Sequence, residues 1–202
     1  MPKPQLWLPN PPAGTAICVG FDGSETDDHT ALRCETRDGL LFTPRFGPDR
    51  RPTIWNPAEH GGRIPRGEVH AAVDEVFGTW NVARMYGDPY DWQSELGEWA
   101  LKYGDDRVIP WATNRITAMH AAIRRFETDL RTRITHDGCP IAALHMGNCR
   151  RVPKPGDKYI LGKPSQHQKI DAAMASILAH EAASDAREAG WDDVDGRVFC
   201  FS

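Results

Sequence analysis

The sequence predicts an α/β domain built around a mixed β-sheet. Three short apolar segments, with a turn signal before the last, occupy the first part of the chain and are typical of an antiparallel meander. After residue 66, short apolar strands alternate with segments whose apolar residues recur at helical spacing. The chain has 202 residues, of which 40% are hydrophobic and 26% charged, so it can bury the core of one such domain.

The first elements are predicted from local patterns. The meander strands are expected at Ala16–Phe21, Thr30–Thr36 and Leu40–Thr43. Before them, residues 1–15 are rich in proline and indicate an extended arm or interdomain linker. After them, residues 44–66 are rich in Pro, Arg and Gly and predict a long loop.

The later elements alternate between helix and strand. Helices are predicted around Val69–Phe77 and Trp92–Ala100, and strands at Trp80–Tyr86, Val108–Trp111 and Lys158–Leu161. The longest helix is expected at Asn114–Ile134, with a buried stripe of Ile116, Met119, Ile123, Phe126 and Leu130. The last helix is expected to begin with a capping box from Ser165 to Gln168 and to end by Gly190. The domain would then span residues 16–190, followed by a tail at 191–202.

The charged residues are distributed unevenly. Residues 1–106 carry 10 Lys/Arg against 17 Asp/Glu, residues 107–169 carry 12 against 4, and residues 170–202 carry 2 against 7. A basic stretch inside an acidic protein suggests a phosphate-facing surface beside a cation-binding one, although a solvated helix face would give the same pattern.

Several classes of protein are excluded or disfavoured. No stretch approaches the length of apolar sequence that a helix needs to cross a bilayer, and the first residues lack the apolar core of a signal peptide. Five scattered cysteines without a CxxC pair are expected to be reduced thiols in a cytosol. A structural zinc site at Cys139, His145 and Cys149 is an alternative, but it lacks a paired-ligand knuckle.

Three aspartates stand where a sheet-based active site is expected. Asp22 and Asp88 each follow a buried strand, so neighbouring strands could place them side by side. With Ser165 as N-cap, Asp171 would be the sixth helical residue, too deep to cap, on the face of Met174, Ala175 and Leu178. A buried carboxylate requires a cation, either a metal ion or a lysine such as Lys163 or Lys169.

A cluster of these acids would favour a pair of divalent cations. Without them, repulsion would force at least one carboxyl group to take up a proton. Mg²⁺ or Mn²⁺ at two positions fits oxygen ligands and is the usual apparatus for hydrolysing a phosphodiester. The basic block of residues 107–169 would supply the surface for a nucleic-acid backbone.

The ordered motifs resemble the nuclease domain of tailed-phage terminase large subunits over about residues 16–188. The resemblance rests on the sequences Val-Gly-Phe-Asp-Gly-Ser at 19–24, Asp-His-Thr-Ala-Leu at 28–32, Met-Tyr-Gly-Asp-Pro at 85–89, Leu-His-Met-Gly-Asn at 144–148 and Lys-Ile-Asp-Ala-Ala-Met-Ala at 169–175. It implies a ribonuclease-H-like mixed sheet with helices packed on both faces. It also implies that Asp22, Asp88 and Asp171 are metal-binding catalytic acids that use two Mg²⁺ or Mn²⁺ ions to cut concatemeric double-stranded DNA during genome packaging.

The resemblance also implies partners and a compartment. They would be double-stranded DNA, an ATPase domain or subunit, the small terminase subunit and the portal, in the host cytoplasm. Terminase large subunits of this kind carry an ATPase domain, but this sequence contains no G-x-x-x-x-G-K-[ST] phosphate loop. We therefore expect an isolated nuclease half or a split version with a separate ATPase chain.

Further residues are candidates for supporting roles. Asp28 could add a carboxylate, and His145 or His167 could shuttle a proton or contact the scissile phosphate. The DNA-binding candidates are Arg124, Arg125, Arg150, Arg151, Lys163 and Lys169. The tryptophans at positions 80, 92, 99 and 111 are expected in the core.

Three other functions remain open. Holliday-junction resolvases and transposases are ribonuclease-H-like enzymes with similar acids. The Asp-Gly-Ser turn at 22–24 also looks like the first phosphate motif of the sugar-kinase and actin-like superfamily. A non-catalytic DNA-docking domain, in which the acids only cap and turn, would show no metal dependence.

Overall fold

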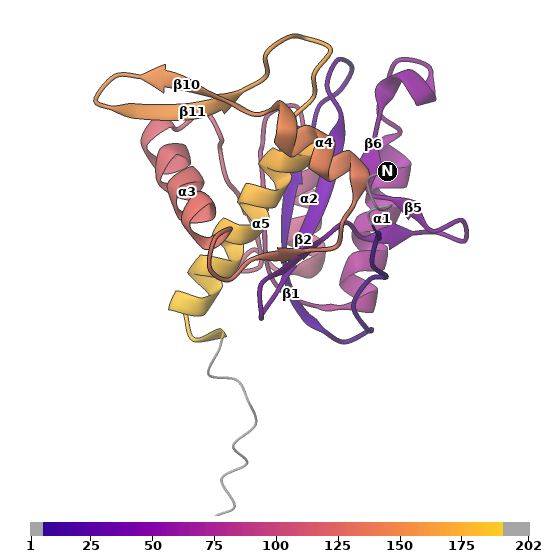
Figure 1. The fold of residues 1–202 in the computed structure, drawn as a ribbon. Coiled ribbons are helices and arrows are strands. Elements are labelled where there is room, and N and C mark those ends of the chain that lie inside the picture. Colours follow the sequence, from indigo (N-terminus) through magenta and orange to yellow (C-terminus); the bar gives the residue numbers. More distant parts are fainter. Residues whose placement is uncertain (1–5, 192–202) are drawn as a thin grey trace, which may run out of the picture.

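The computed structural model describes residues 6–191, and they form an α/β fold around a mixed seven-stranded sheet (Figure 1). The strands of this sheet are β1 (Ala16–Asp22), β2 (Thr30–Thr36), β3 (Leu40–Phe42), β6 (Ile54–Trp55), β7 (Asn81–Gly87), β8 (Val108–Pro110) and β9 (Thr135–His136). Their order is β8-β7-β1-β2-β3-β9, with β6 paired to β2. Strands β1, β2 and β3 are successively antiparallel, which confirms the predicted meander, and β7 and β8 extend the sheet in parallel.

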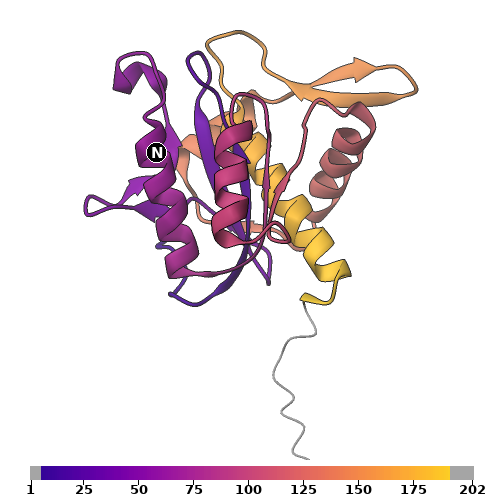
Figure 2. The ribbon, with the colours of Figure 1, turned by 180° about the vertical axis from the view of Figure 1, so that it is seen from behind.

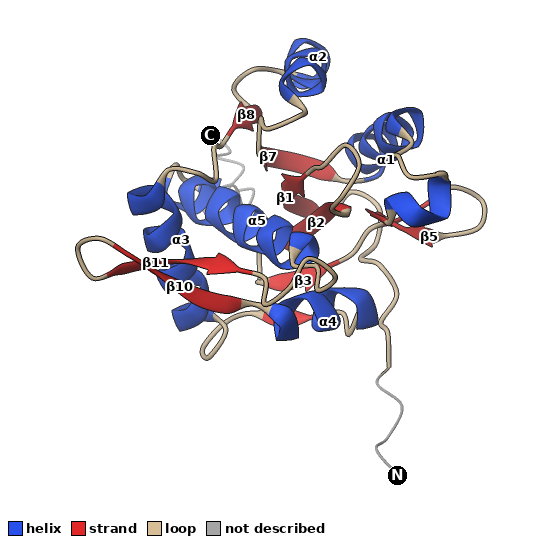
Figure 3. Cartoon of the chain, turned by 90° about the horizontal axis from the view of Figure 1, so that it is seen from above, coloured by secondary structure: helices blue, strands red, loops and turns tan. Residues whose placement is uncertain are grey.

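Helices cover both faces of the sheet, as Figures 2 and 3 show. The α-helices are α1 (Arg66–Thr79), α2 (Gln93–Tyr103), α3 (Ile116–Asp129), α4 (Pro140–Asn148) and α5 (Asp171–Glu188). Alternation along β1 divides the core, because successive side chains of a strand point to opposite faces. Ile17, Val19 and Phe21 pack in the cluster that contains α1 and α2, whereas Cys18 packs in the cluster that contains α3 and α5.

The predicted core tryptophans belong to these clusters. Trp80, Trp92 and Trp99 lie on the α1 and α2 side, and Trp111 lies on the α3 and α5 side. All are buried, and Phe21 makes edge contacts with both Trp92 and Trp99. The prediction that they are core residues is confirmed.

The region 44–66 is not the long loop that its composition suggested. It contains the small hairpin of β4 (Arg45–Phe46) and β5 (Arg51–Pro52), then β6, and then the 3-10 helix η1 (Pro57–His60). Thr53 explains part of this order, because its buried hydroxyl donates to the carbonyl oxygens of Leu32 and Pro44. Tertiary pairing with β2 therefore overrides the turn-rich composition of the segment.

Helix α3 is shorter than predicted, and α5 is the longest helix of the described residues. Helix α3 ends at Asp129, and two members of the expected buried stripe, Ile116 and Leu130, are exposed. Met119, Ile123 and Phe126 are buried as expected. The apolar segment at 141–146 lies within α4, a helix that Pro140 begins at its first turn.

The predicted strand at residues 158–161 belongs to a separate hairpin. β10 (Arg150–Lys154) pairs with β11 (Lys158–Gly162), and this ribbon lies across the end of α3 rather than in the central sheet (Figure 1). Sequence reasoning did not predict β10, and it also missed β9, whose two residues pair in parallel with β3.

Helix α5 begins at Asp171, so the predicted start after Ser165 is wrong. Residues 165–168 form a turn instead, in which the Gln168 N–H donates to the Ser165 carbonyl oxygen over 3.2 Å. Asp171 is thus the first helical residue and not the sixth. The expected end of this helix by Gly190 agrees with its observed end at Glu188.

Both ends of the chain bear on the domain boundaries that we expected. Within the proline-rich segment, Trp7 Nε1 donates to Asp137 Oδ2 over 3.1 Å, and the Leu8 N–H donates to the Asp137 carbonyl oxygen. Residues 7 and 8 therefore lie against the domain. Residues 1–5 and nearly all of the predicted tail, 192–202 with Cys200, lie outside the described residues. Across 6–191, no helix combines the length and the hydrophobicity needed to cross a membrane.

Candidate active site

Asp22 and Asp88 come to the same edge of the central sheet because β1 and β7 are adjacent parallel strands. Phe21 pairs with Gly87 in their register, and the Asp88 N–H donates to the Phe21 carbonyl oxygen over 3.0 Å. Each aspartate therefore stands at the carboxyl end of its strand, beside the other strand. This is the arrangement that the sequence pattern predicted for the two strands.

Hydrogen bonds orient the Asp88 carboxylate. Thr113 Oγ1 donates to Oδ2, and the Tyr90 N–H donates to Oδ1 over 3.3 Å. The side chain is largely buried, with 9% of the residue exposed. These donors hold the carboxylate at the end of β7.

Asp171 reaches the same edge because α5 crosses β1 at very close range. A Cβ atom at Gly20 would lie 2.0 Å from the Ala175 carbonyl oxygen and 2.3 Å from the Ala179 nitrogen. Asp171 lies one helical turn before Ala175, towards the end of β1 that carries Asp22. The residue is 7% exposed, and its buried Oδ2 has no hydrogen-bond partner among the described residues.

The three aspartates act on one another electrostatically. Burial, followed by the charges of Asp171, Asp88 and Asp28, raises the pKa of Asp22 well above its usual range. Burial is also the main reason why the pKa of Asp171 rises to about 6, and Asp28 adds to this effect. The protein alone therefore does not compensate the negative charge of this cluster.

Asp28 takes both of the lysines that could have paired with Asp171. Lys163 Nζ and Lys169 Nζ lie 2.5 and 2.7 Å from Asp28 Oδ1, and Lys169 also donates to the Asp27 carbonyl oxygen. Burial raises the pKa of Asp28, but the hydrogen bonds from the two lysines outweigh burial and hold the pKa below its usual value. The lysines are close enough to lower the pKa of Asp171, but its Oδ2 remains unpaired.

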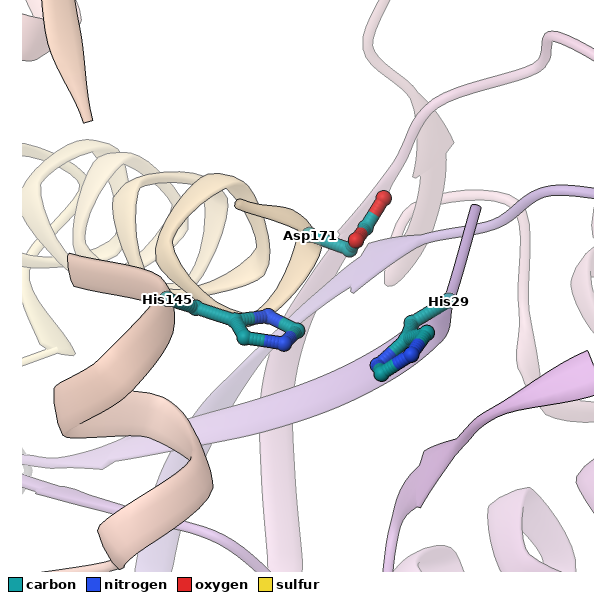
Figure 4. Close-up of side chains that lie close together, drawn as sticks. All are labelled: His29, His145 and Asp171. Carbon is teal, nitrogen blue, oxygen red and sulfur yellow. The ribbon is translucent and has the colours of Figure 1, made fainter. Parts of the chain in front are cut away.

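Two histidines adjoin Asp171 (Figure 4). One potential ligand atom from each of His29, His145 and Asp171 lies within 4.8 Å of the other two. His145 comes from α4, Asp171 from the start of α5, and His29 from the position before β2. Sequence reasoning selected His145 but missed His29, although its position next to Asp28, directly before a buried strand, was an available signal.

Both imidazoles favour their neutral forms. Burial, with smaller effects of His29 and Lys169, lowers the pKa of His145 to about 4. Burial and Lys169 also lower the pKa of His29. Neither ring therefore offsets the charge of the carboxylates at neutral pH.

The alternative zinc site does not form. Cys139 is the N-cap of α4 and Cys149 is its C-cap. A helix of this length separates its two caps by about 15 Å, since each residue adds about 1.5 Å. The two thiols therefore cannot share one ion with His145. The four cysteines of the described residues, at positions 18, 34, 139 and 149, are free thiols.

The aspartate cluster fits divalent cations chemically. Asp22, Asp88 and Asp171 offer carboxylate oxygens, which are the ligands that Mg²⁺ and Mn²⁺ prefer. The unpartnered Oδ2 of Asp171 points to a missing positive group, and the raised pKa values of Asp22 and Asp171 report the same deficit. We therefore regard these three residues as the candidate metal ligands.

Most of the candidate DNA-binding residues are already engaged within the protein. Arg125 pairs with Glu181 over 2.6 Å, Arg151 pairs with Glu127 over 2.7 Å, and Lys163 and Lys169 pair with Asp28. Arg150 instead donates to the carbonyl oxygens of Gly147 and Cys149, and Arg124 is exposed on α3. His167 is exposed in the turn before α5.

Clefts open onto the histidines. One cleft of about 620 Å³ lies between the segment before α5, the end of α4 and the start of η1, and its walls include His29, His145, Asn148 and Lys169. A second cleft of about 620 Å³ shares His29 and His145. Solvent and ligands can therefore reach the surroundings of Asp171 from this side.

Comparisons with known proteins were made for the sequence and for the fold. No family model matches the chain. It is 31% identical over 185 residues to the Gene 13 protein of Mycobacterium phage L5 and 32% identical over 185 residues to that of Mycobacterium phage D29. Both matches cover 85% of this chain and 30% of the relative, so the chain spans less than a third of the length of these curated relatives.

Solved structures with a similar fold are large terminases and their nuclease domains. The large terminase nuclease of thermophilic phage G20c superposes with a TM-score of 0.63 at 11% identity, over 87% of this chain and 92% of that one. The large terminase of bacteriophage HK97 gives 0.63 at 16% identity, over 89% and 41%, and the nuclease domain of Thermus phage P74-26 gives 0.59 at 14%, over 87% and 89%. The chain therefore has the ribonuclease-H-like fold of tailed-phage large terminase nuclease domains, as its motifs led us to expect.

Proposed function

We propose that this chain is a metal-dependent endonuclease that cuts concatemeric double-stranded phage DNA during genome packaging. The observation that supports this most is the convergence of Asp22, Asp88 and Asp171 on one edge of the sheet without a compensating cation. In this proposal the three carboxylates hold two divalent cations, and Asp28 is an auxiliary acid. The likeness of the fold to phage nuclease domains supports the same function.

The roles of the residues follow from their placement. When bound, two divalent cations would activate a water molecule for attack on a phosphodiester and stabilise the leaving oxygen. Asp22 and Asp88 hold their positions through the paired strands, and Asp171 through α5, so the ligand set is preorganised by the core. Structures of the G20c nuclease contain bound magnesium or bound cobalt, which supports the use of divalent ions here.

We propose that DNA lies over the basic residues next to this edge. Arg124 on α3 and Arg150 at the base of the β10–β11 hairpin do not pair with an acid among the described residues, and Lys163 and Lys169 stand beside Asp28. These side chains would contact phosphates and would carry no sequence information themselves. Arg125 and Arg151 would contribute less because each already pairs with a glutamate.

The proposed setting is the packaging motor in the host cytoplasm. The chain covers 41% of the HK97 large terminase and 42% of the large terminase of another thermophilic bacteriophage, which was solved in complex with ATP-γ-S. We infer that an ATPase domain or a separate ATPase chain works with this nuclease, together with the small terminase subunit and the portal.

Plasmid cleavage in Mn²⁺ tests the proposed activity. Replacing Asp22, Asp88 or Asp171 singly by Asn should reduce cleavage to background while the variants remain folded, because each loses a charged ligand of nearly unchanged shape. Asp105→Asn, at an exposed position between α2 and β8, is the matched control and should cut like the wild type. Continued cutting by all three variants would refute the assignment.

The substrate and the alternatives need a second comparison. Linear duplex and four-way junction DNA offered together should show cutting of the duplex. Preference for the junction would instead favour a resolvase. A wild type that binds DNA but cuts neither substrate with Mg²⁺, Mn²⁺ or Co²⁺ would favour a docking module.

A further inference from the structure

His145 has one ring nitrogen committed to the backbone of α5. The Ala172 N–H donates to His145 Nδ1 over 3.0 Å in a buried position. Ala172 is the second residue of α5, so its N–H has no carbonyl partner within the helix. Nδ1 must present a lone pair to accept this bond and therefore carries no hydrogen.

The other ring nitrogen must then be a donor. A neutral imidazole has one N–H and one lone pair, so Nε2 of His145 carries the hydrogen. Within residues 6–191, Nε2 has no hydrogen-bond partner in the protein, and the buried Oδ2 of Asp171 also remains unpaired. Because His145 lines both 620 Å³ clefts, this N–H is available to a ligand that enters from them.

His145 is excluded as a metal ligand for the same reason. The atoms of His29, His145 and Asp171 are spaced closely enough to surround an ion. A metal ion, however, binds the lone pair of an imidazole, and the lone pair of His145 already accepts the Ala172 N–H. Binding at Nε2 would move the hydrogen to Nδ1, directly against that donor.

We propose that His145 Nε2–H donates a hydrogen bond to a phosphate oxygen of bound DNA, next to the carboxylates that hold the cations. The proposal rests on the proposed nuclease function, in which cations neutralise Asp171 and allow a phosphate to approach. Lys169 is on the wall of the same cleft and adds a positive charge beside His145. In duplex DNA, the phosphate oxygens are the strong acceptors that project outward from the stack, whereas the bases are paired.

Two substitutions of His145 separate the donor role from capping of α5. Asn can place its Oδ1 near the position of Nδ1, which keeps an acceptor for Ala172 and removes the distal donor. Gln can place its amide nitrogen near the position of Nε2, which keeps the donor and removes the acceptor at Nδ1. Each variant should be measured for thermal stability, for Mn²⁺ affinity by calorimetry and for affinity to a labelled duplex in Ca²⁺ by fluorescence anisotropy.

The expected results differ between the two variants. His145→Asn should keep the Mn²⁺ affinity of the wild type and bind DNA about tenfold more weakly, because it loses one hydrogen bond to a charged group. His145→Gln should melt at a lower temperature, because Ala172 loses its acceptor, but should keep DNA affinity within about threefold of the wild type.

Several results would overturn the proposal. Wild-type DNA affinity in a folded His145→Asn variant would leave only a capping role, and loss of Mn²⁺ binding in that variant would make the residue a metal ligand. If the Asn variant does not fold, tenfold weaker DNA binding by a folded His145→Gln variant decides against the donor role, and near-wild-type binding supports it. These measurements do not require cleavage, so failure of the nuclease proposal would appear separately, as a wild type that does not cut.

Discussion

At the residue scale, Asp171 concentrates the electrostatic cost of the candidate site. It is 7% exposed, its Oδ2 has no partner among the described residues, and its pKa is raised to about 6. Without a cation, the folded protein must therefore keep an ionised carboxylate in a poorly solvated position at neutral pH. A functional residue of this kind is expected to reduce stability in the absence of its ligand.

The stability of the metal-free protein should fall as the pH rises from about 4 to 6. In this range the folded state binds more protons than the unfolded state, because the pKa of Asp171 is about 6 when folded and near 3.8 when unfolded. A difference of two pKa units corresponds to about 3 kcal/mol, and Asp22 acts in the same direction. Urea denaturation in EDTA across this range measures the effect.

Replacing Asp171 by Asn should raise the free energy of unfolding of the metal-free protein at pH 7 by about 1–3 kcal/mol. It should also flatten the decline between pH 4 and 6, because the amide does not titrate. Asp105→Asn, on the surface, should change neither quantity. A metal-free Asp171→Asn variant that is less stable than the wild type at pH 7 would contradict this account.

At the scale of elements, the site depends on the contact between α5 and β1. Gly20 has no side chain, and a Cβ atom there would lie only 2.0 Å from the Ala175 carbonyl oxygen. The helix can therefore pack its backbone directly on the strand, which carries Asp171 to the end of β1. Small residues on the same face of α5, including Ala175, Ala179 and Ala182, are fully buried and permit this approach.

Gly20→Ala should destabilise the protein by about 3 kcal/mol, because the clash is with backbone atoms that cannot rotate away. It should also weaken Mn²⁺ binding, since α5 must shift and Asp171 with it. Thermal denaturation and calorimetry measure these effects. Gly97→Ala is the matched control: position 97 lies within α2 with no atom near an added Cβ, so the variant should gain about 0.5–1 kcal/mol. Equal stability of the two variants would show that the close approach is not required.

A second connection between elements lies at the other end of α5. His180 Nδ1 is 2.7 Å from Glu35 Oε2, and Arg187 Nη2 donates to Glu35 Oε1 over 2.7 Å. Glu35 and His180 are completely buried, so these contacts join β2 to α5 within the core. They stabilise the orientation of the helix far from the aspartates.

At the scale of the whole molecule, internal ion pairs reduce the charge that the basic block offers to DNA. Arg151 pairs with Glu127 and lies over the Tyr159 ring, whereas Arg150 has only carbonyl partners. The two adjacent residues therefore differ in the charge available to a phosphate. Net charge in the sequence cannot distinguish them.

The dependence of DNA affinity on salt should report this difference. If Arg150 contacts a phosphate, Arg150→Ala should reduce the slope of log K against log salt by about 0.9, and Arg151→Ala should reduce it by less. Lys102→Ala is the control, because Lys102 pairs with Asp74 on the α1 and α2 side of the sheet. The slope is measured by fluorescence anisotropy in Ca²⁺ over a range of salt concentrations. A larger change for Arg151 than for Arg150 would contradict the assignment.

Much of the architecture was predictable from local patterns. The strands β1 and β2 have the boundaries expected to within one residue, because buried apolar runs between turn residues specify short strands. The alternation that follows them predicted the parallel part of the sheet. Asp22 and Asp88 were found for the same reason, since a residue directly after a buried strand must stand at a sheet edge.

The sequence by itself therefore determined the order of the main elements and the residues that end the central strands. Only the tertiary structure decided where α5 begins, because His145, 27 positions earlier, accepts the Ala172 N–H, and the Ser165 capping pattern forms a turn instead. It also decided that Asp28 takes Lys163 and Lys169, and that His29 lies beside Asp171. Hydrophobic periodicity is a local property of the chain, whereas hydrogen bonds and charge pairs between distant segments exist only after the core has brought those segments together.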